Sequence, residues 1–212
     1  FLNHDFEKSL QVAQKGLQKN ARHAAFNRLV MYNNTDLKRY EDAEKAADAF
    51  FNASDHADYS YLDYRYYGAL LSALKKYDEA IEAYKKGLNL KPSTEIVYVV
   101  EMITSLASIY CDIGKKQEAL ALMEYYLKQC DKANFIFCYA NVLLENDQPI
   151  KAVMNYLKAT MMKDSNTLGE RLLTCYERVI AIYQKTGNED LAKPFEQKYL
   201  ECRAERERIV NK

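Results

Sequence analysis

The chain has 212 residues and carries 30 Lys and Arg against 30 Asp and Glu, so its formal net charge is zero at neutral pH. Proteins that bind nucleic acids usually carry a basic surplus or stripe, and neither is visible, so we expect no nucleic-acid partner. With only 6 Gly and 3 Pro, the composition disfavours a strand-rich or loop-rich protein and favours helices.

The first segment, residues 5–19, reads as one amphipathic helix without a partner helix. Residues 22–53 and 59–92 each read as two helices joined by a polar turn. In the second pair the turn is Lys75-Lys76, and Pro92 ends the helix because proline disfavours helical geometry in the residue before it. Either Asp58 or Ser60 is expected to cap the helix that begins near residue 59.

Three further pairs follow, at residues 94–131, 133–164 and 166–210. Gly114 and Gly187 stand just past the end of a first helix, where glycine is a stop signal. Pro149 falls in the first turn of a helix, where it is tolerated. The last helix is charged on most faces, as expected of a helix that ends an array and has no further neighbour to cover it.

The segment 61–92 reads YLDYRYYGALLSALKKYDEAIEAYKKGLNLKP. It has Tyr64, Tyr67-Gly68 and Leu71 in its first helix, and alanine, tyrosine, glycine and proline at matching positions in and after its second. This spacing resembles the tetratricopeptide repeat. Gly68, Ala80 and Gly87 are expected where two helices approach closely.

The small residue of the second helix recurs along the chain at intervals of 34, 37, 39, 33 and 40 residues, close to the family's period of about 34. These anchor residues are Ser9, Ala43, Ala80, Ala119, Ala152 and Ala192. The resemblance therefore covers nearly all of residues 1–212 as a single array. It implies an all-α fold, a right-handed α-α superhelix in which helical hairpins stack as a solenoid.

No motif for enzymatic chemistry stands out. The histidines His4, His23 and His56 have no metal-ligand spacing, and no phosphate-binding loop or nucleophile motif occurs. We therefore expect no enzyme, no metal and no cofactor. No apolar run approaches the ~18 residues of a membrane-spanning helix, so the chain is predicted not to be transmembrane.

The five cysteines, at positions 111, 130, 138, 175 and 202, are odd in number and include no CxxC pair. Such a set argues against a disulfide framework and favours a reducing compartment such as the cytoplasm. Export remains open, with a signal upstream of Phe1. Cys138 and Cys175 are expected to be the most buried of the five or to face a binding groove.

The family resemblance implies a non-catalytic scaffold for protein interactions, in which the first helix of each pair lines a concave groove that holds a peptide or protein segment. Periodicity indicates which side chains of those helices point away from the core: Asn27, Met31, Leu62, Arg65, Tyr66, Ala69, Glu101, Thr104, Ser108, Asn134, Phe137, Asn141 and Leu144.

Arg65, Tyr66 and Phe137 are the candidate anchors of this groove, because arginine and aromatic side chains dominate the energetics of interfaces. Packing against a neighbouring unit is the alternative for Tyr66 and Phe137. One subfamily grips the terminal carboxylate of chaperone partners with lysines and arginines, but apart from Arg65 those residues are absent, so such binding is not predicted.

Two other roles stay open. The chain could act in a structural or assembly role as a homo-oligomer, with the incomplete first unit accepting a helix from a second copy. It could also be the regulatory part of a larger protein or enzyme.

Overall fold

The computed structural model describes residues 5–53, 58–90 and 96–210, which form eleven α-helices and one short 3-10 helix and contain no strand. The all-α, repeat-like fold class predicted from the sequence is confirmed. His4, His56, the predicted stop at Pro92 and the predicted start at residue 94 lie outside the described residues. None of the described helices has the length and apolar character that crossing a membrane would require.

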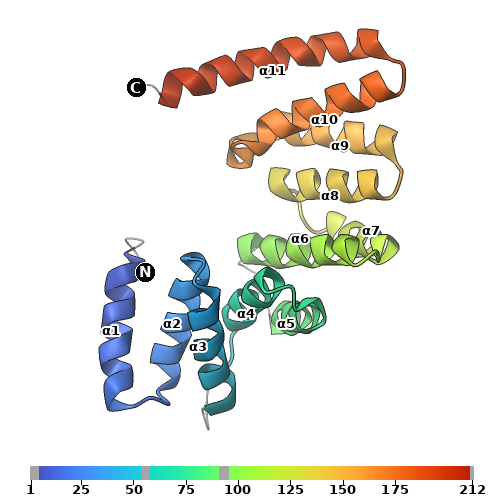
Figure 1. The fold of residues 1–212 in the computed structure, drawn as a ribbon. Helices are drawn as coiled ribbons and strands as arrows, with labels where there is room; N and C mark the ends of the chain where they lie inside the picture. Colours follow the sequence, from blue (N-terminus) through green and yellow to red (C-terminus); the bar gives the residue numbers. More distant parts are fainter. Residues whose placement is uncertain (1–4, 54–57, 91–95, 211–212) are drawn as a thin grey trace. The chain divides into compact units, whose positions relative to one another are not determined.

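Contacts divide the chain into two compact units, Phe1–Ile109 and Tyr110–Lys212. The first unit holds α1 (Phe6–Lys19), α2 (Ala24–Asp36), α3 (Tyr40–Ala53), α4 (Tyr61–Ala73), α5 (Tyr77–Leu90) and most of α6 (Ile96–Asp112) (Figure 1). The second holds α7 (Lys116–Leu127), α8 (Ala133–Glu145), α9 (Pro149–Met161), the 3-10 helix η1 (Ser165–Leu168), α10 (Arg171–Lys185) and α11 (Glu189–Val210).

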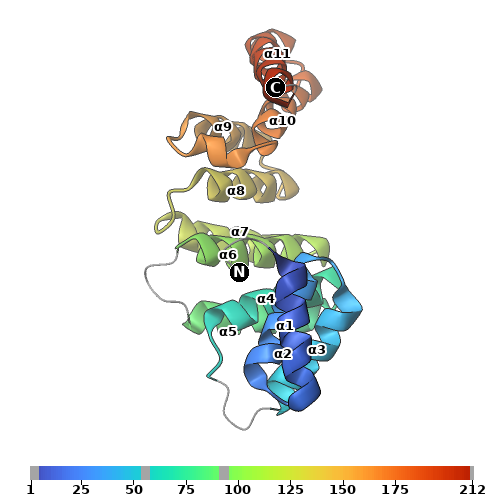
Figure 2. The ribbon, with the colours of Figure 1, turned by 90° about the vertical axis from the view of Figure 1, so that its left-hand side faces the viewer.

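Within each unit, consecutive helices pack as hairpins. In the first unit α2 packs on α3 and α4 packs on α5, while α1 packs on α2 (Figures 1 and 2). In the second, α8 packs on α9 and α10 packs on α11, and α10 also contacts α9. Contacts of α2 and α3 with α4, and of α9 with α10, join one hairpin to the next within a unit, which is how repeat arrays gain stability.

One turn geometry recurs in five places, at each junction between the two helices of a pair. A residue in the left-handed region, with φ between 56° and 80°, follows each first helix: Lys38, Lys75, Gly114, Asp147 and Gly187. The N–H of each left-handed residue donates a hydrogen bond to the carbonyl three residues before it, at 3.0–3.1 Å. The N–H of the following residue donates to the carbonyl five residues before that one, at 2.7–3.0 Å. This is a Schellman motif. The predicted glycine stops at 114 and 187 are confirmed.

An alanine stands five residues after each of these left-handed residues and is 0–1% exposed: Ala43, Ala80, Ala119, Ala152 and Ala192. The register predicted from the small residues is therefore confirmed at these five positions. The sixth anchor, Ser9 in α1, is half-buried, and its hydroxyl accepts a hydrogen bond from the Asn33 amide at 2.7 Å. A methyl group or hydroxyl is small enough to let the paired helix approach closely.

Two glycines mark the closest approaches around α4 and α5, as predicted. A methyl group on Gly68 would lie 2.8 Å from the ring of Tyr84. A methyl group on Gly87 would lie 2.8 Å from the sulfur of Met102 in α6 and 3.3 Å from the backbone oxygen of Tyr61. Side chains essentially never make contacts as short as 2.8 Å, so a larger residue at either position would force its neighbours to shift.

The two most buried thiols are Cys175, at 0% exposure, and Cys130, at 4%. Burial raises the pKa of Cys175 to about 12 and the pKa of Cys130 to about 11. The prediction for Cys175 is confirmed, whereas Cys130 and not Cys138 is the second buried thiol. Cys130 lies between α7 and α8, and loop residues are normally expected at the surface; Cys138 is half-buried.

Candidate functional site

Side chains from α2, α4 and α6 meet in the first unit and form what we call the aromatic patch: Tyr32, Arg65, Tyr66, Tyr98 and Glu101. The ring of Tyr66 stacks on the ring of Tyr32, with 4.0 Å between centroids and 17° between planes. The Tyr66 hydroxyl lies 3.1 Å from an Asp36 carboxylate oxygen. Burial raises the pKa of the Tyr66 phenol above its ordinary value.

Arg65 is fixed within the patch by charge and by stacking. Its Nε pairs with Glu101 Oε2 at 2.5 Å, and its guanidinium lies 4.7 Å from the Tyr66 centroid and 5.2 Å from the Tyr98 centroid. Its side chain is 22% exposed, against 47% for Glu101. Cation–π contacts of this kind are stronger where water is partly excluded. The patch therefore holds the half-buried Arg65, Tyr66 and Tyr98 in fixed positions beside the partly exposed side chain of Glu101.

A buried carboxylate supports the patch from below. Asp63 is completely buried and accepts hydrogen bonds from the Tyr32 hydroxyl at 2.6 Å and from the N–H and hydroxyl of Ser60 at 2.7 and 2.9 Å. Arg28 Nε lies 2.8 Å from the same carboxylate, as a charge contact and not an aligned hydrogen bond. Burial, with a smaller effect of Asp63, raises the pKa of Tyr32 well above its usual range.

This buried network was missed in the sequence, although a signal was there. Ser60 is followed three residues later by Asp63, and the two form a capping box at the start of α4. The prediction of Ser60 as one of two candidate caps is confirmed. What the spacing does not reveal is that the carboxylate also reaches Tyr32 and Arg28 on α2.

The other predicted groove residues of the first unit differ widely in exposure. Met31 has no exposed surface and Asn27 is 4% exposed, so in this structure neither offers surface to a partner. Asn27 instead donates a hydrogen bond to the Ala21 carbonyl at 3.0 Å. Leu62, Ala69 and Thr104 are half-buried, and Ser108 is exposed.

In the second unit, α8 positions its candidate residues mostly against neighbouring helices. Phe137 is 7% exposed, lies 5.8 Å from the Tyr156 ring centroid, and is covered by the guanidinium of Arg171. Asn134 accepts a hydrogen bond from Arg171 at 3.1 Å, and Asn141 accepts one from Tyr156 at 2.6 Å. Leu144 is half-buried. Phe137 therefore packs internally, which is the alternative that the sequence left open.

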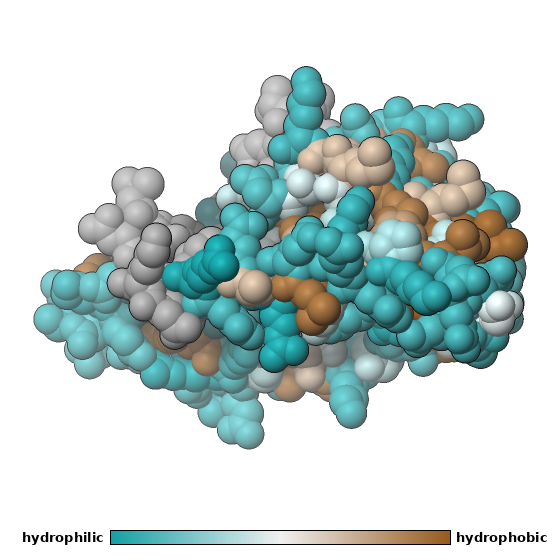
Figure 3. All heavy atoms as spheres, turned by 90° about the horizontal axis from the view of Figure 1, so that it is seen from above, coloured by the Kyte–Doolittle hydropathy of each residue, from teal (hydrophilic) through white to brown (hydrophobic). Residues whose placement is uncertain are grey.

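An apolar stripe that the sequence analysis missed lies on the outer face of α9. Ile150, Met154 and Met161 are 75%, 65% and 83% exposed, and the half-buried Leu157 completes a spacing of four, three and four residues. That spacing places all four on one side of the helix. Seen from above, the surface in Figure 3 is mostly hydrophilic, with smaller hydrophobic areas.

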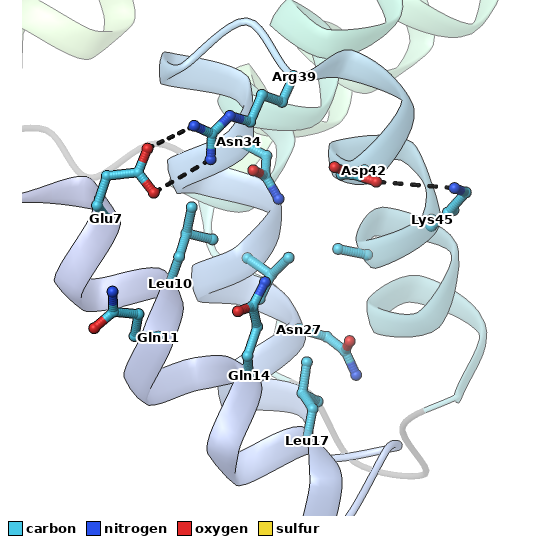
Figure 4. Close-up of a pocket in the computed structure, with 12 residues that line it drawn as sticks. Glu7, Leu10, Gln11, Gln14, Leu17, Asn27, Asn34, Arg39, Asp42 and Lys45 are labelled. Atoms are coloured by element: carbon cyan, nitrogen blue, oxygen red, sulfur yellow. Dashed lines mark hydrogen bonds and ion pairs between the residues drawn. The ribbon is translucent and has the colours of Figure 1, made fainter.

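A pocket of about 360 Å³ lies between α1, α2 and α3 (Figure 4). Its walls carry Gln11 and Gln14 from α1 and Asn27 and Asn34 from α2. Sequence reasoning gave no sign of it. Across residues 5–53, 58–90 and 96–210, His, Cys, Asp and Glu form no group of three or more that could hold a metal ion.

The family model of the tetratricopeptide repeat matches residues 67–94. The chain contains a tetratricopeptide repeat. The resemblance predicted for the segment 61–92 is thereby confirmed from residue 67 onwards. The C-terminal part of a tetratricopeptide repeat-containing protein from Cytophaga hutchinsonii has a similar fold, with 18% identity, a TM-score of 0.73, and coverage of 95% of this chain and 75% of that one.

MamA from Desulfovibrio magneticus is also similar, with a TM-score of 0.66, 14% identity, and coverage of 86% of this chain and 96% of that one. MamA of strain MSR-1 gives a TM-score of 0.60, 15% identity, and coverage of 84% and 95%. None of the curated proteins matches the sequence. At these identities the solved structures establish a shared tetratricopeptide-repeat fold. Such repeats generally serve as non-catalytic scaffolds for protein partners.

Proposed function

We propose that this tetratricopeptide-repeat chain is a non-catalytic scaffold that binds a peptide or protein segment against the first-helix surface of its first unit, centred on the aromatic patch. The observation that carries the proposal is the joint contribution of α2, α4 and α6 to one patch, in which Arg65 is held between Tyr66 and Tyr98 and paired with Glu101. Arginine and tyrosine are enriched among residues that dominate binding energies.

The fixed geometry of the patch favours binding because little side-chain freedom remains to be lost. Ordering one flexible side chain at an interface costs about 0.5–1.5 kcal/mol. Tyr66 is already stacked on Tyr32, and Arg65 is already ion-paired, so part of this cost has been met during folding. The exposed half of Glu101 remains available to a donor or cation on the partner segment.

Affinity capture with a matched pair of variants tests this proposal. Tyr66→Ala removes the ring at the centre of the patch, whereas Tyr125→Ala removes a ring that is 66% exposed on α7. Partners captured from an extract of the source cells by the wild type should be lost with Tyr66→Ala and retained with Tyr125→Ala, after both variants are shown by circular dichroism to be folded. Equal recovery with both variants would place the binding surface elsewhere.

Self-association is a second candidate function, and the stripe on α9 favours it. Ile150, Met154 and Met161 expose apolar surface on one helix face, and pairing with the same face of a second copy would bury it. Light scattering over a range of concentrations is the test: a mass that rises with concentration and returns to that of a monomer in Met154→Lys supports assembly. A monomeric mass at every concentration removes this candidate.

A further inference from the structure

The pocket between α1, α2 and α3 has the features of a second binding site. Leu10, Leu17 and Val30 supply an apolar lining, while carboxamides from α1 and α2 stand on its walls (Figure 4). Its volume of about 360 Å³ lies at the small end of the range for ligand pockets. Such a pocket suits a few residues of an extended chain and excludes a folded domain.

The charged side chains at the pocket are paired with one another. Arg39 reaches both carboxylate oxygens of Glu7, at 2.5 and 3.3 Å, and Lys45 lies 3.8 Å from Asp42 (Figure 4). Two positive and two negative groups therefore cancel within the lining. A charged ligand would find no uncompensated counter-charge here, so the chemistry of the pocket favours an uncharged ligand.

Asn34 points to the kind of ligand. Its side chain is 4% exposed and lines the pocket, yet among the described residues its carboxamide has no hydrogen-bond partner. Of the neighbouring buried amides, Asn27 donates to the Ala21 carbonyl at 3.0 Å and Asn33 donates to the Ser9 hydroxyl at 2.7 Å, while the Asn33 Oδ1 is buried without a partner in the described ranges. The Asn34 carboxamide lines the pocket without a partner in the described part of the chain, so its donors and its acceptor are available to a ligand.

We propose that this pocket binds an uncharged peptide segment and that the Asn34 carboxamide pairs with one of its peptide groups. A carboxamide offers one carbonyl acceptor and two N–H donors, which complement the C=O and N–H of a peptide bond. Gln11 and Gln14 offer the same groups on the α1 wall, and an apolar ligand side chain would contact Leu10 and Val30. Except for Asn27, this site shares no residue with the predicted groove, so the two proposals can fail separately.

Nuclear magnetic resonance of the ¹⁵N-labelled chain tests the proposal with blocked tripeptides, N-acetyl-Ala-X-Ala-amide, in which X is Leu, Phe or Gln. At least one of these tripeptides should shift the Asn34 side-chain amide resonances, and the shift should saturate with a dissociation constant below about 10 mM, as expected of so small a contact. The tripeptides with X as Asp or Lys should bind at least about tenfold more weakly. Absence of a saturable shift with all three uncharged peptides, or equal binding of the charged ones, would overturn the proposal.

Two sets of variants separate binding from folding. Asn34→Leu keeps the size of the side chain and removes the amide, so it should weaken binding by about tenfold or more while leaving the thermal midpoint unchanged or higher. Gln14→Trp should block the pocket, whereas Gln18→Trp, on the same helix but outside the pocket lining, should bind as the wild type does. A lower midpoint for Asn34→Leu, or unchanged binding by Asn34→Leu or Gln14→Trp, contradicts the proposed role.

Discussion

Replacing Asp63 by alanine is expected to destabilise the first unit more than any exposed substitution near it. The completely buried carboxylate joins α4 to α2 through Tyr32 and Arg28, and it also caps α4 through Ser60. Alanine leaves each of these groups without its acceptor. Because the site is enclosed, water cannot fully replace the lost bonds.

The expected cost follows from the contacts. Loss of the capping interaction costs about 1 kcal/mol, and a buried Tyr32 hydroxyl left without an acceptor costs about 1–3 kcal/mol. The side chain of Arg28 is 33% exposed, so water compensates it in part. Together these effects give a loss of about 2–4 kcal/mol in the free energy of unfolding.

Urea denaturation followed by circular dichroism measures this loss. At the slopes usual for small domains, the midpoint should fall by about 1–2 M. Asp58→Ala is the matched control, because Asp58 was the other candidate cap and is exposed. The Asp58→Ala substitution should lower the free energy of unfolding by less than about 0.5 kcal/mol. Equal midpoints for the two variants would show that the buried network does not hold α2 and α4 together.

Three further outcomes are expected. Lys75→Gly should stabilise the chain and Gly114→Ala should destabilise it, each by up to about 1 kcal/mol. Both positions have a left-handed backbone, which glycine adopts more readily than other residues. Shifts of the denaturation midpoint in the opposite directions would contradict this prediction. Gly68→Leu should cost about 1–3 kcal/mol through its clash with a buried ring, and Tyr64→Phe far less, so reversed midpoints would refute the helix register. Finally, the difference in free energy of unfolding between the wild type and Cys175→Ala should depend on pH. It should be full below pH about 9 and decline as pH rises towards 12, because the pKa of the Cys175 thiol is near 9 in the unfolded chain and about 12 in the folded one. A difference that stays constant from about pH 8 to 11 would argue against the burial of this thiol.

Features that depend on local spacing could be predicted from the sequence. The alanine register and the close approaches at Gly68 and Gly87 follow from helical periodicity and from residue size. The sequence narrows the cap of α4 to Asp58 or Ser60 because both side chains can accept a hydrogen bond from the first turn, and Ser60 does so. Each involves one hairpin or the start of one helix. For the same reason the family resemblance was clearest over the segment 61–92, where all of these signals occur together.

Features that depend on a third helix could not be predicted. The burial of Phe137 depends on a helix from another hairpin, because it is covered by Arg171, which lies 34 residues later in the chain. The pocket at Asn34 depends on the distance between α1 and α3, which no spacing within one helix encodes. Helical periodicity identifies the faces of a helix but not which of them a neighbour will cover.

The five left-handed turns carry lysine twice, glycine twice and aspartate once, yet they share one pattern of backbone bonds. Main-chain geometry thus recurs where side-chain identity has diverged. A profile built on residue identity finds the repeat once, over residues 67–94, although the chain reverses in the same way five times. Counting left-handed residues that stand five positions before a buried alanine would therefore reveal degenerate arrays of this kind that residue matching overlooks.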